Sequence, residues 1–150
     1  MYAKTIQFTD YDGNEREETF YFNLNKAEVI KWEGSTLGGL KNTMDKIIQT
    51  KDQSRLIALF DDIICRSYGE KSPDGKYFRK SEEILENFKS TQAYSNLFTE
   101  LASNDQAASE FVNGILPADL LEEARKIEEE EKKKGNVQAL PGYKAEAPKV

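Results

Sequence analysis

The first 24 residues constrain the fold more than any other part of the chain, because they alternate as two β-strands around a tight turn. The turn is an Asp-Gly-Asn sequence at positions 12–14, and Asp-Gly between alternating segments is a strong hairpin signal. The apolar positions of the two strands are Ile6, Phe8, Phe20, Phe22 and Leu24. A lone hairpin is only marginally stable in water. The sequence therefore predicts a hairpin over residues 2–24 whose apolar face packs on helices or on a partner's sheet, with its edges as candidate docking sites.

The apolar residues that follow the hairpin have the periodicity of short amphipathic helices. The strongest stripe lies between Asp52 and Tyr68 and predicts a central helix. Asn25 and Glu28 have capping-box spacing at the start of an earlier helix. Other helix starts are expected at Ser35 or Thr36, Ser81, Thr91, Asn104 or Asp105, and Pro117. The predicted fold class is α+β, mainly α: an N-terminal β-hairpin packed on a compact bundle of about six short helices that span residues 26–127.

A chain of 150 residues is long enough for one domain and hardly for two. The apolar periodicity ends near Ile127, so residues 1–127 are expected to form a single globular domain. Residues 128–150 begin with four Glu followed by three Lys, which predicts a charged helix end. Past Gly135 the composition predicts a flexible tail, because few apolar residues remain to pack.

The charge balance argues against two classes of partner. Lys and Arg number 21 against 27 Asp and Glu, and the resulting net charge of −6 opposes capture of nucleic acid or an anionic membrane. No apolar stretch approaches the length of about 18 residues that a membrane span needs, and the N-terminus lacks the apolar core of an export signal. One Cys excludes an internal disulfide framework. We therefore expect a protein of a reducing cytoplasm that binds other proteins, and neither nucleic acid nor membrane.

The chain contains no His, which removes the usual zinc, haem and catalytic-triad chemistry. Asp10, Asp12 and Asn14 have the spacing of the first three ligands of a calcium loop. However, Gly13 is misplaced for that loop, and Tyr21 stands where its closing Glu belongs, so a hairpin turn is the better interpretation. The glycines form no phosphate-binding fingerprint after a strand. We expect no metal site and no cofactor.

Cys65 is the only thiol, and the helical wheel places it on the polar half of the central helix near Asp61 and Asp62. These carboxylates oppose thiolate formation and no His can act as a base, so an unreactive Cys packed under a second layer is favoured over a nucleophile. Adjacent carboxylates such as Asp61 and Asp62 point about 100° apart on a helix and cannot share one reacting atom. The sequence therefore predicts no catalytic residues and a protein that is not an enzyme.

Trp32, Tyr77 and Phe78 are the aromatic residues that no helical stripe explains. Tyr77 and Phe78 follow a Ser-Pro-Asp-Gly sequence at 72–75, which predicts a turn. The simpler interpretation is that the three side chains fill gaps between elements. The alternative is that they anchor a partner, because Trp and Tyr are common at interface hot spots. We take these three residues as the candidate partner-binding site.

Several segments, taken in order along the chain, resemble a known family. They are Asp12-Gly13-Asn14-Glu15-Arg16, Phe20-Tyr21-Phe22-Asn23-Leu24, Lys26-Ala27-Glu28, Gly38-Gly39-Leu40, Tyr68-Gly69-Glu70-Lys71-Ser72-Pro73-Asp74-Gly75-Lys76 and Phe111-Val112-Asn113-Gly114-Ile115-Leu116-Pro117. Over about residues 2–121, the chain resembles the small tail assembly chaperones of long-tailed (siphovirus-type) phages and prophages of Gram-positive bacteria. The resemblance is one of overall layout rather than of an active-site motif.

The resemblance implies a non-enzymatic protein that binds the tape-measure protein and recruits tail-tube subunits around it in the host cell cytoplasm. Members of such families are generally absent from the finished virion. In many of them a programmed ribosomal frameshift appends a second segment that contacts the tube protein, and here a slippery codon stretch would encode Lys132–Gly135. Self-association through the hairpin edges into a homo-oligomer is also compatible with this role.

Two other classes of function stay open. A small phage-encoded inhibitor of a host factor could use an acidic surface to mimic nucleic acid, and carboxylates clustered on one face would favour it. An enzyme that uses only Asp, Glu, Lys or Tyr would need a deep pocket with two carboxyl groups at glycosidase-like separation. We rank the tail assembly chaperone first, another binding protein second and an enzyme third.

Overall fold

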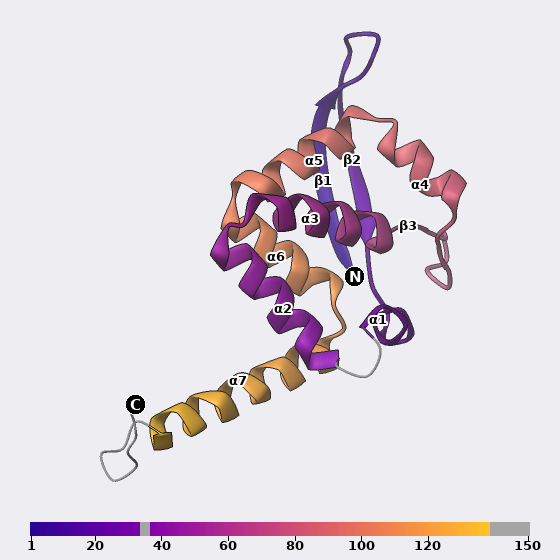
Figure 1. Ribbon diagram of the computed structural model, residues 1–150. Coiled ribbons are helices and arrows are strands. Elements are labelled where there is room, and N and C mark those ends of the chain that lie inside the picture. The colour runs from indigo at the N-terminus through magenta and orange to yellow at the C-terminus, as the bar shows by residue number, and fades with distance from the viewer. Residues whose placement is uncertain (34–36, 139–150) are drawn as a thin grey trace.

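The computed structural model describes residues 1–33 and 37–138 and confirms an α+β fold that is mainly α (Figure 1). The strands are β1 (Tyr2–Thr9), β2 (Glu15–Phe22), β3 (Tyr68–Lys71) and β4 (Phe78–Arg79). The helices of the described residues are α1 (Lys26–Glu33), α2 (Leu37–Thr50), α3 (Gln53–Ser67), α4 (Glu82–Lys89), α5 (Gln92–Ser103), α6 (Asp105–Ile115) and α7 (Ala118–Gln138). These ranges hold seven helices where the sequence predicts about six.

The N-terminal hairpin forms around the predicted turn, and β1 and β2 pair antiparallel along their full lengths. Gly13 has a φ of +86°, a conformation that residues with a side chain rarely adopt. Asp10 Oδ1 accepts the backbone N–H groups of Asp12 at 3.0 Å and Asn14 at 2.9 Å. Arg16 Nε donates to the other oxygen of Asp10 at 2.7 Å. The residues that resemble a calcium loop therefore build the hairpin turn.

The hairpin is half of a four-stranded antiparallel sheet in the order β1-β2-β3-β4, and the sequence does not predict the other half. The apolar stripe assigns Tyr68 to the end of the central helix, but Tyr68 begins β3 and pairs with Phe22. The predicted turn at 72–75 is confirmed as the link from β3 to β4, and its Gly75 has a φ of +78°. β3 is only four residues long and pairs with a distant strand, so its local sequence carries no strand period.

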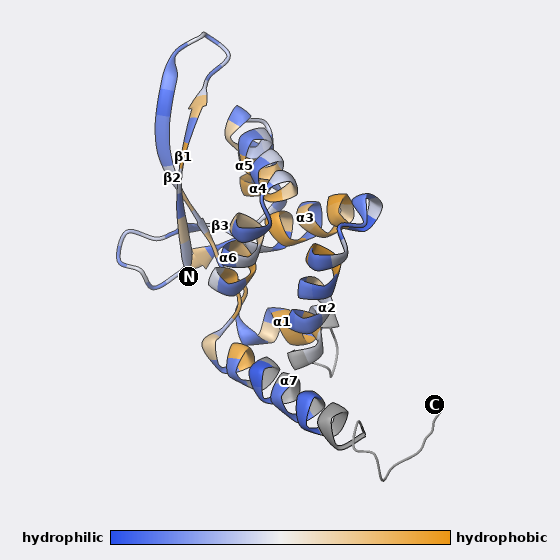
Figure 2. Ribbon diagram, turned by 90° about the vertical axis from the view of Figure 1, so that its left-hand side faces the viewer, coloured by the Kyte–Doolittle hydropathy of each residue, from blue (hydrophilic) through white to orange (hydrophobic). Residues whose placement is uncertain are grey.

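The helices lie on one side of the β1–β2 hairpin, and no helix of the described residues covers its other side (Figure 2). At the centre of the core, Phe88 of α4 stacks on Tyr68, with ring centroids 4.2 Å apart. Phe88 also contacts Phe20 at 5.1 Å and Phe22 at 5.8 Å. Phe22 in turn meets Phe111 of α6 at 5.1 Å. The apolar face of the hairpin thus packs on the chain's own helices.

The final described helix, α7, follows Pro117 as predicted and packs its first turns against α2. It continues past Gly135 to Gln138, although a flexible tail is predicted there. Glu and Lys side chains four residues apart stabilise an exposed helix, and one Gly costs only about 1 kcal/mol. Residues 139–150, the rest of the predicted tail, and the expected caps at Ser35 or Thr36 lie outside the described residues. A domain boundary at residue 127 stays a prediction.

Tyr68 is expected to make the stability depend on pH in the alkaline range. Burial raises the pKa of Tyr68 to about 12, and the Glu70 and Glu18 carboxylates add to this rise. In the unfolded chain the hydroxyl ionises near pH 10. The stability contributed by the neutral phenol is therefore fully present below pH 10 and is lost as the pH rises to about 12. Tyr68→Phe removes the titrating group, so its free energy of unfolding should fall less steeply over this interval.

Urea unfolding of both proteins at about pH 8 and about pH 11 measures this difference. Tyr77→Phe is the control, because it removes the same hydroxyl group from a side chain that is half exposed rather than buried. Equal losses of stability in wild type and Tyr68→Phe would contradict the prediction.

Candidate partner-binding surfaces

Trp32 lies on α1 with its ring partly covered by α3. The Arg66 guanidinium is 4.6 Å from the centroid of the Trp32 ring, which is the geometry of a cation–π contact. Glu28 and Lys31 lie beside Trp32 in a shallow pocket of about 190 Å³. The side chain thus combines packing within the fold with a partly exposed face.

Phe78 has a structural role in the sheet. A Cβ added to Gly69 of β3 would lie 2.7 Å from Cε2 of the Phe78 ring, so the ring lies directly on this glycine. Tyr77 is 49% exposed and carries Arg79 at 4.8 Å from its ring centroid. Tyr77, just before β4, thus contacts Arg79, whereas Phe78 in β4 contacts Gly69 and Lys80.

Lys80 joins the surroundings of Trp32 and Phe78. Its Nζ donates to Glu28 Oε2 on α1, to the carbonyl oxygen of Asn23 and to the carbonyl oxygen of Arg66, each at 2.7 Å. The same Nζ lies 5.6 Å from the centroid of the Phe78 ring. We call Trp32, Phe78 and Lys80 the aromatic corner. The structure brings these residues near each other, and a binding role for Trp32, Tyr77 and Phe78 stays a prediction.

A second surface, which the sequence analysis missed, is a groove of about 380 Å³ between α3 and α5. Ile57, Ala58 and Asp61 line it from α3. The α5 side consists of Tyr94, Ser95, Phe98 and Thr99. The apolar stripe predicts a buried Ile57, but its side chain is 53% exposed. That stripe covers about half of the helical wheel, which is wider than the face that α3 buries against its neighbours. The width of the stripe is therefore the one sequence feature that indicates an exposed apolar residue on this helix.

Asp61 is the one acidic side chain among the groove-lining residues. Tyr94 donates its hydroxyl to Asp61 Oδ1 at 2.7 Å, and the Cys65 thiol donates to the same oxygen at 3.7 Å. Burial and, after it, Asp61 raise the pKa of both the Tyr94 hydroxyl and the Cys65 thiol. Both groups are therefore protonated at neutral pH, which agrees with the prediction of an unreactive Cys65.

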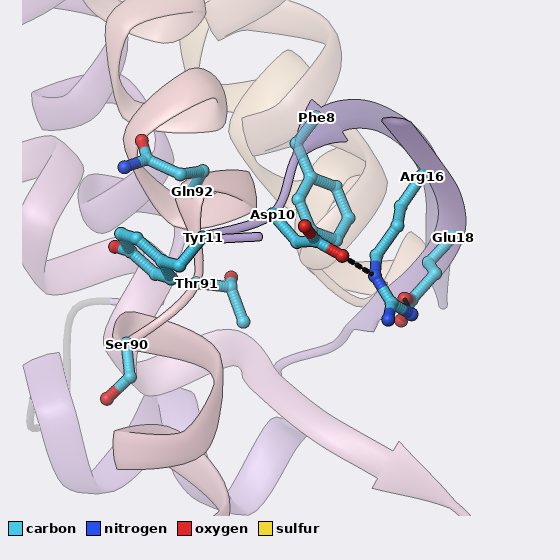
Figure 3. Close-up of a pocket in the computed structure, with 8 residues that line it drawn as sticks. All are labelled: Phe8, Asp10, Tyr11, Arg16, Glu18, Ser90, Thr91 and Gln92. Atoms are coloured by element: carbon cyan, nitrogen blue, oxygen red, sulfur yellow. Dashed lines mark hydrogen bonds and ion pairs between the residues drawn. The ribbon is translucent and has the colours of Figure 1, made fainter. Parts of the chain in front are cut away.

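A third surface is a cleft of about 240 Å³ between the N-terminal hairpin and the α4–α5 junction (Figure 3). Phe8 lines it from the hairpin, and Ser90 and Thr91 line it from the junction. Hydrogen bonding from Arg16 holds the pKa of Asp10 below its usual value. Asp10 is already engaged by Arg16 and by the turn, so its carboxylate is not free to act as a base in this cleft.

A cluster of metal ligands or a membrane-spanning helix in the described residues would indicate another kind of function. They include no group of three or more Cys, Asp or Glu side chains placed to hold a metal ion. None of the helices within residues 1–33 and 37–138 is both long and apolar enough to cross a bilayer. What these residues do provide are open surfaces for contact with another molecule.

The comparison with protein families favours the first of the three classes that the sequence left open. A family model described as phage tail assembly chaperone matches residues 1–149. The chain belongs to this family. No curated protein and no solved structure gives a match. A tail assembly chaperone acts on other proteins during phage tail assembly, so its described grooves and its aromatic corner are candidate contact surfaces for those proteins.

Proposed function

We propose that this tail assembly chaperone binds the tape-measure protein and recruits tail-tube subunits around it, in the host cell cytoplasm, and that it is not retained in the virion. The family match over residues 1–149 carries the proposal. The open surfaces support it, because partial apolar contact gives affinity without permanent association. The role requires no catalysis and no cofactor.

Co-expression tests the proposal directly. The tagged chain is produced with the tape-measure protein of the phage that encodes it, with and without the tube protein, and retained proteins are identified by mass spectrometry. We expect the tape-measure protein to be retained in soluble form, and purified virions to lack the chaperone. Retention of a host protein alone would instead favour the alternative function, inhibition of a host factor.

We expect Trp32→Ala to weaken binding of the tape-measure protein by about tenfold, because a partly exposed Trp at an interface is a typical hot spot. Tyr77→Ala and Phe78→Ala should weaken binding by similar factors, and all three variants should unfold cooperatively. Titration calorimetry with the co-purified partner fragment measures the affinity. Ile30→Ala is a control, because Ile30 is 44% exposed on the same helix as Trp32 and does not line any of the three surfaces described above. Unchanged binding in all three variants would remove these residues from the proposed surface.

Two further parts of the proposal concern the longer product and assembly. A frameshift at the codons for Lys132–Gly135 would append a segment that contacts the tube protein. The gene must then contain a slippery heptamer there and an open downstream frame, and absence of either would exclude the frameshift. If the chain self-associates through its hairpin edges, its average molecular mass in sedimentation equilibrium should rise with protein concentration.

A further inference from the structure

The groove between α3 and α5 has the form of a receptor for a helix. Ile57 exposes an aliphatic side chain on one wall, and Phe98 lies on the other. Ala58 and Ser95 are small, which lets a partner's backbone approach closely. The lining positions on each wall are spaced by four residues, so they follow about one turn of each helix.

Asp61 gives this mainly apolar groove a specific charge. Its Oδ1 receives both the Tyr94 hydroxyl and the Cys65 thiol. Within the described residues, Oδ2 takes part in no hydrogen bond or ion pair, and Lys89 directs its Nζ to the Tyr94 ring at 5.7 Å. An apolar surface that covered this carboxylate would remove the water molecules that hydrogen-bond to it and would supply no other partner, which costs free energy. An occupant therefore needs a cation at this point.

We propose that the groove binds an amphipathic helix that packs apolar side chains on Ile57 and Phe98 and places a Lys or Arg on Asp61 Oδ2. The inference rests on the proposed function, in which this helix is a segment of the tape-measure protein. A helix satisfies its own backbone hydrogen bonds, whereas an extended peptide would find only helix side chains along this groove and no strand edge. The ion pair is stronger once the bound helix displaces water from the groove, because the local dielectric constant falls. A helix without the cation would leave the Asp61 carboxylate unpaired and would therefore bind more weakly.

Photo-crosslinking locates the occupant. A photo-crosslinking residue at position 95, which lines the groove and is exposed, is placed in the full chain and irradiated in complex with the tape-measure protein. The cross-linked segment should contain a Lys or Arg flanked by apolar residues three or four positions away. A cross-linked segment without a basic residue, or cross-links only to a second copy of the chain, would overturn the proposal.

Two substitutions test the walls and the charge separately. Ile57→Lys should weaken binding of the tape-measure protein by about tenfold or more, whereas Ile30→Lys, at an isoleucine that is 44% exposed on α1, should not. Asp61→Asn keeps an acceptor for Tyr94 and should weaken binding by about threefold to tenfold. Asp62→Asn is its control, because Asp62 is exposed on the same helix and does not line the groove.

The result also separates this inference from the proposed function. If wild type binds the tape-measure protein and both Ile57→Lys and Asp61→Asn bind equally well, the groove is not the site and the proposed function stands. If wild type does not bind, both fail. If Asp61→Lys loses binding and a tape-measure protein with the cross-linked Lys or Arg changed to Glu restores it, the ion pair is established.

Discussion

Phe88→Ala is expected to lower the free energy of unfolding by about 3–5 kcal/mol, which is typical of a large aromatic side chain lost from a packed core. Phe88 is 2% exposed and contacts the rings of Tyr68, Phe20 and Phe22. The three partner rings come from two strands, β2 and β3, and Phe88 itself comes from α4, which follows them in sequence. Removing Phe88 therefore leaves a cavity at the place where α4 holds the sheet.

Urea unfolding followed by far-UV circular dichroism measures the loss of stability. Phe98→Ala is a suitable control, because Phe98 is only partly buried and lines the open groove, so its truncation leaves no closed cavity. We expect the control to lose less than half as much stability. A loss below about 1 kcal/mol in Phe88→Ala would show that α4 and the sheet can close the space, contrary to the packing described here.

The sequence predicts the elements whose signals are local. The capping box at Asn25 forms in both directions, with Glu28 N–H on Asn25 Oδ1 at 2.8 Å and Asn25 N–H on Glu28 Oε1 at 3.0 Å. Ser81 and Asn104 accept the backbone N–H groups of residues three positions later, as predicted for N-caps. Each of these interactions involves residues close in sequence, so a pattern of residue types is enough to reveal it.

The missed features depend on contacts between distant residues. β3 is a strand because Tyr68 and Gly69 pair with Phe22 and Tyr21 of β2, which lie 46 and 48 residues earlier in the chain (68 − 22 and 69 − 21). Ile57 is exposed because α5 covers a different side of α3, and no property of Ile57 itself indicates which side remains open. The sequence identifies Trp32 as unusual but not its stacking on Arg66. The candidate contact surfaces could therefore be identified only from the tertiary structure.

The family match indicates the role of the chain, and the fold indicates which of its surfaces are available for that role. The family match assigns the chain to phage tail assembly, and the fold indicates where a protein partner could make contact. Asp61 of α3 lines the groove, and Arg66 of the same helix contacts Trp32 and Lys80 of the aromatic corner. Both surfaces are thus built on one continuous helix. The effects of substitutions at the groove and at the aromatic corner on partner binding can therefore be compared within the same fold.

Lys80→Met is expected to lower the free energy of unfolding by about 2–3 kcal/mol, because it removes the donor shared by three acceptors. The ammonium group satisfies the carbonyl oxygens of Asn23 and Arg66 and pairs with Glu28. Arg66 lies in the last turn of α3, where a cation also opposes the negative end of the helix dipole. The methionine keeps most of the side-chain volume, so the loss reports the charge and its hydrogen bonds.

The matched control is Lys26→Met, whose ion pair with Asp119 is more than half exposed on both sides and should therefore contribute little to stability. Measuring Glu28→Gln and the Glu28→Gln/Lys80→Met double variant isolates the pairwise part of the effect. The double variant should lose less stability than the sum of the single ones, because removal of both partners leaves no unpaired carboxylate. Additive losses, or equal effects of Lys80→Met and Lys26→Met, would show that Lys80 does not hold β2, α1 and α3 together, and the aromatic corner would then lose its structural basis.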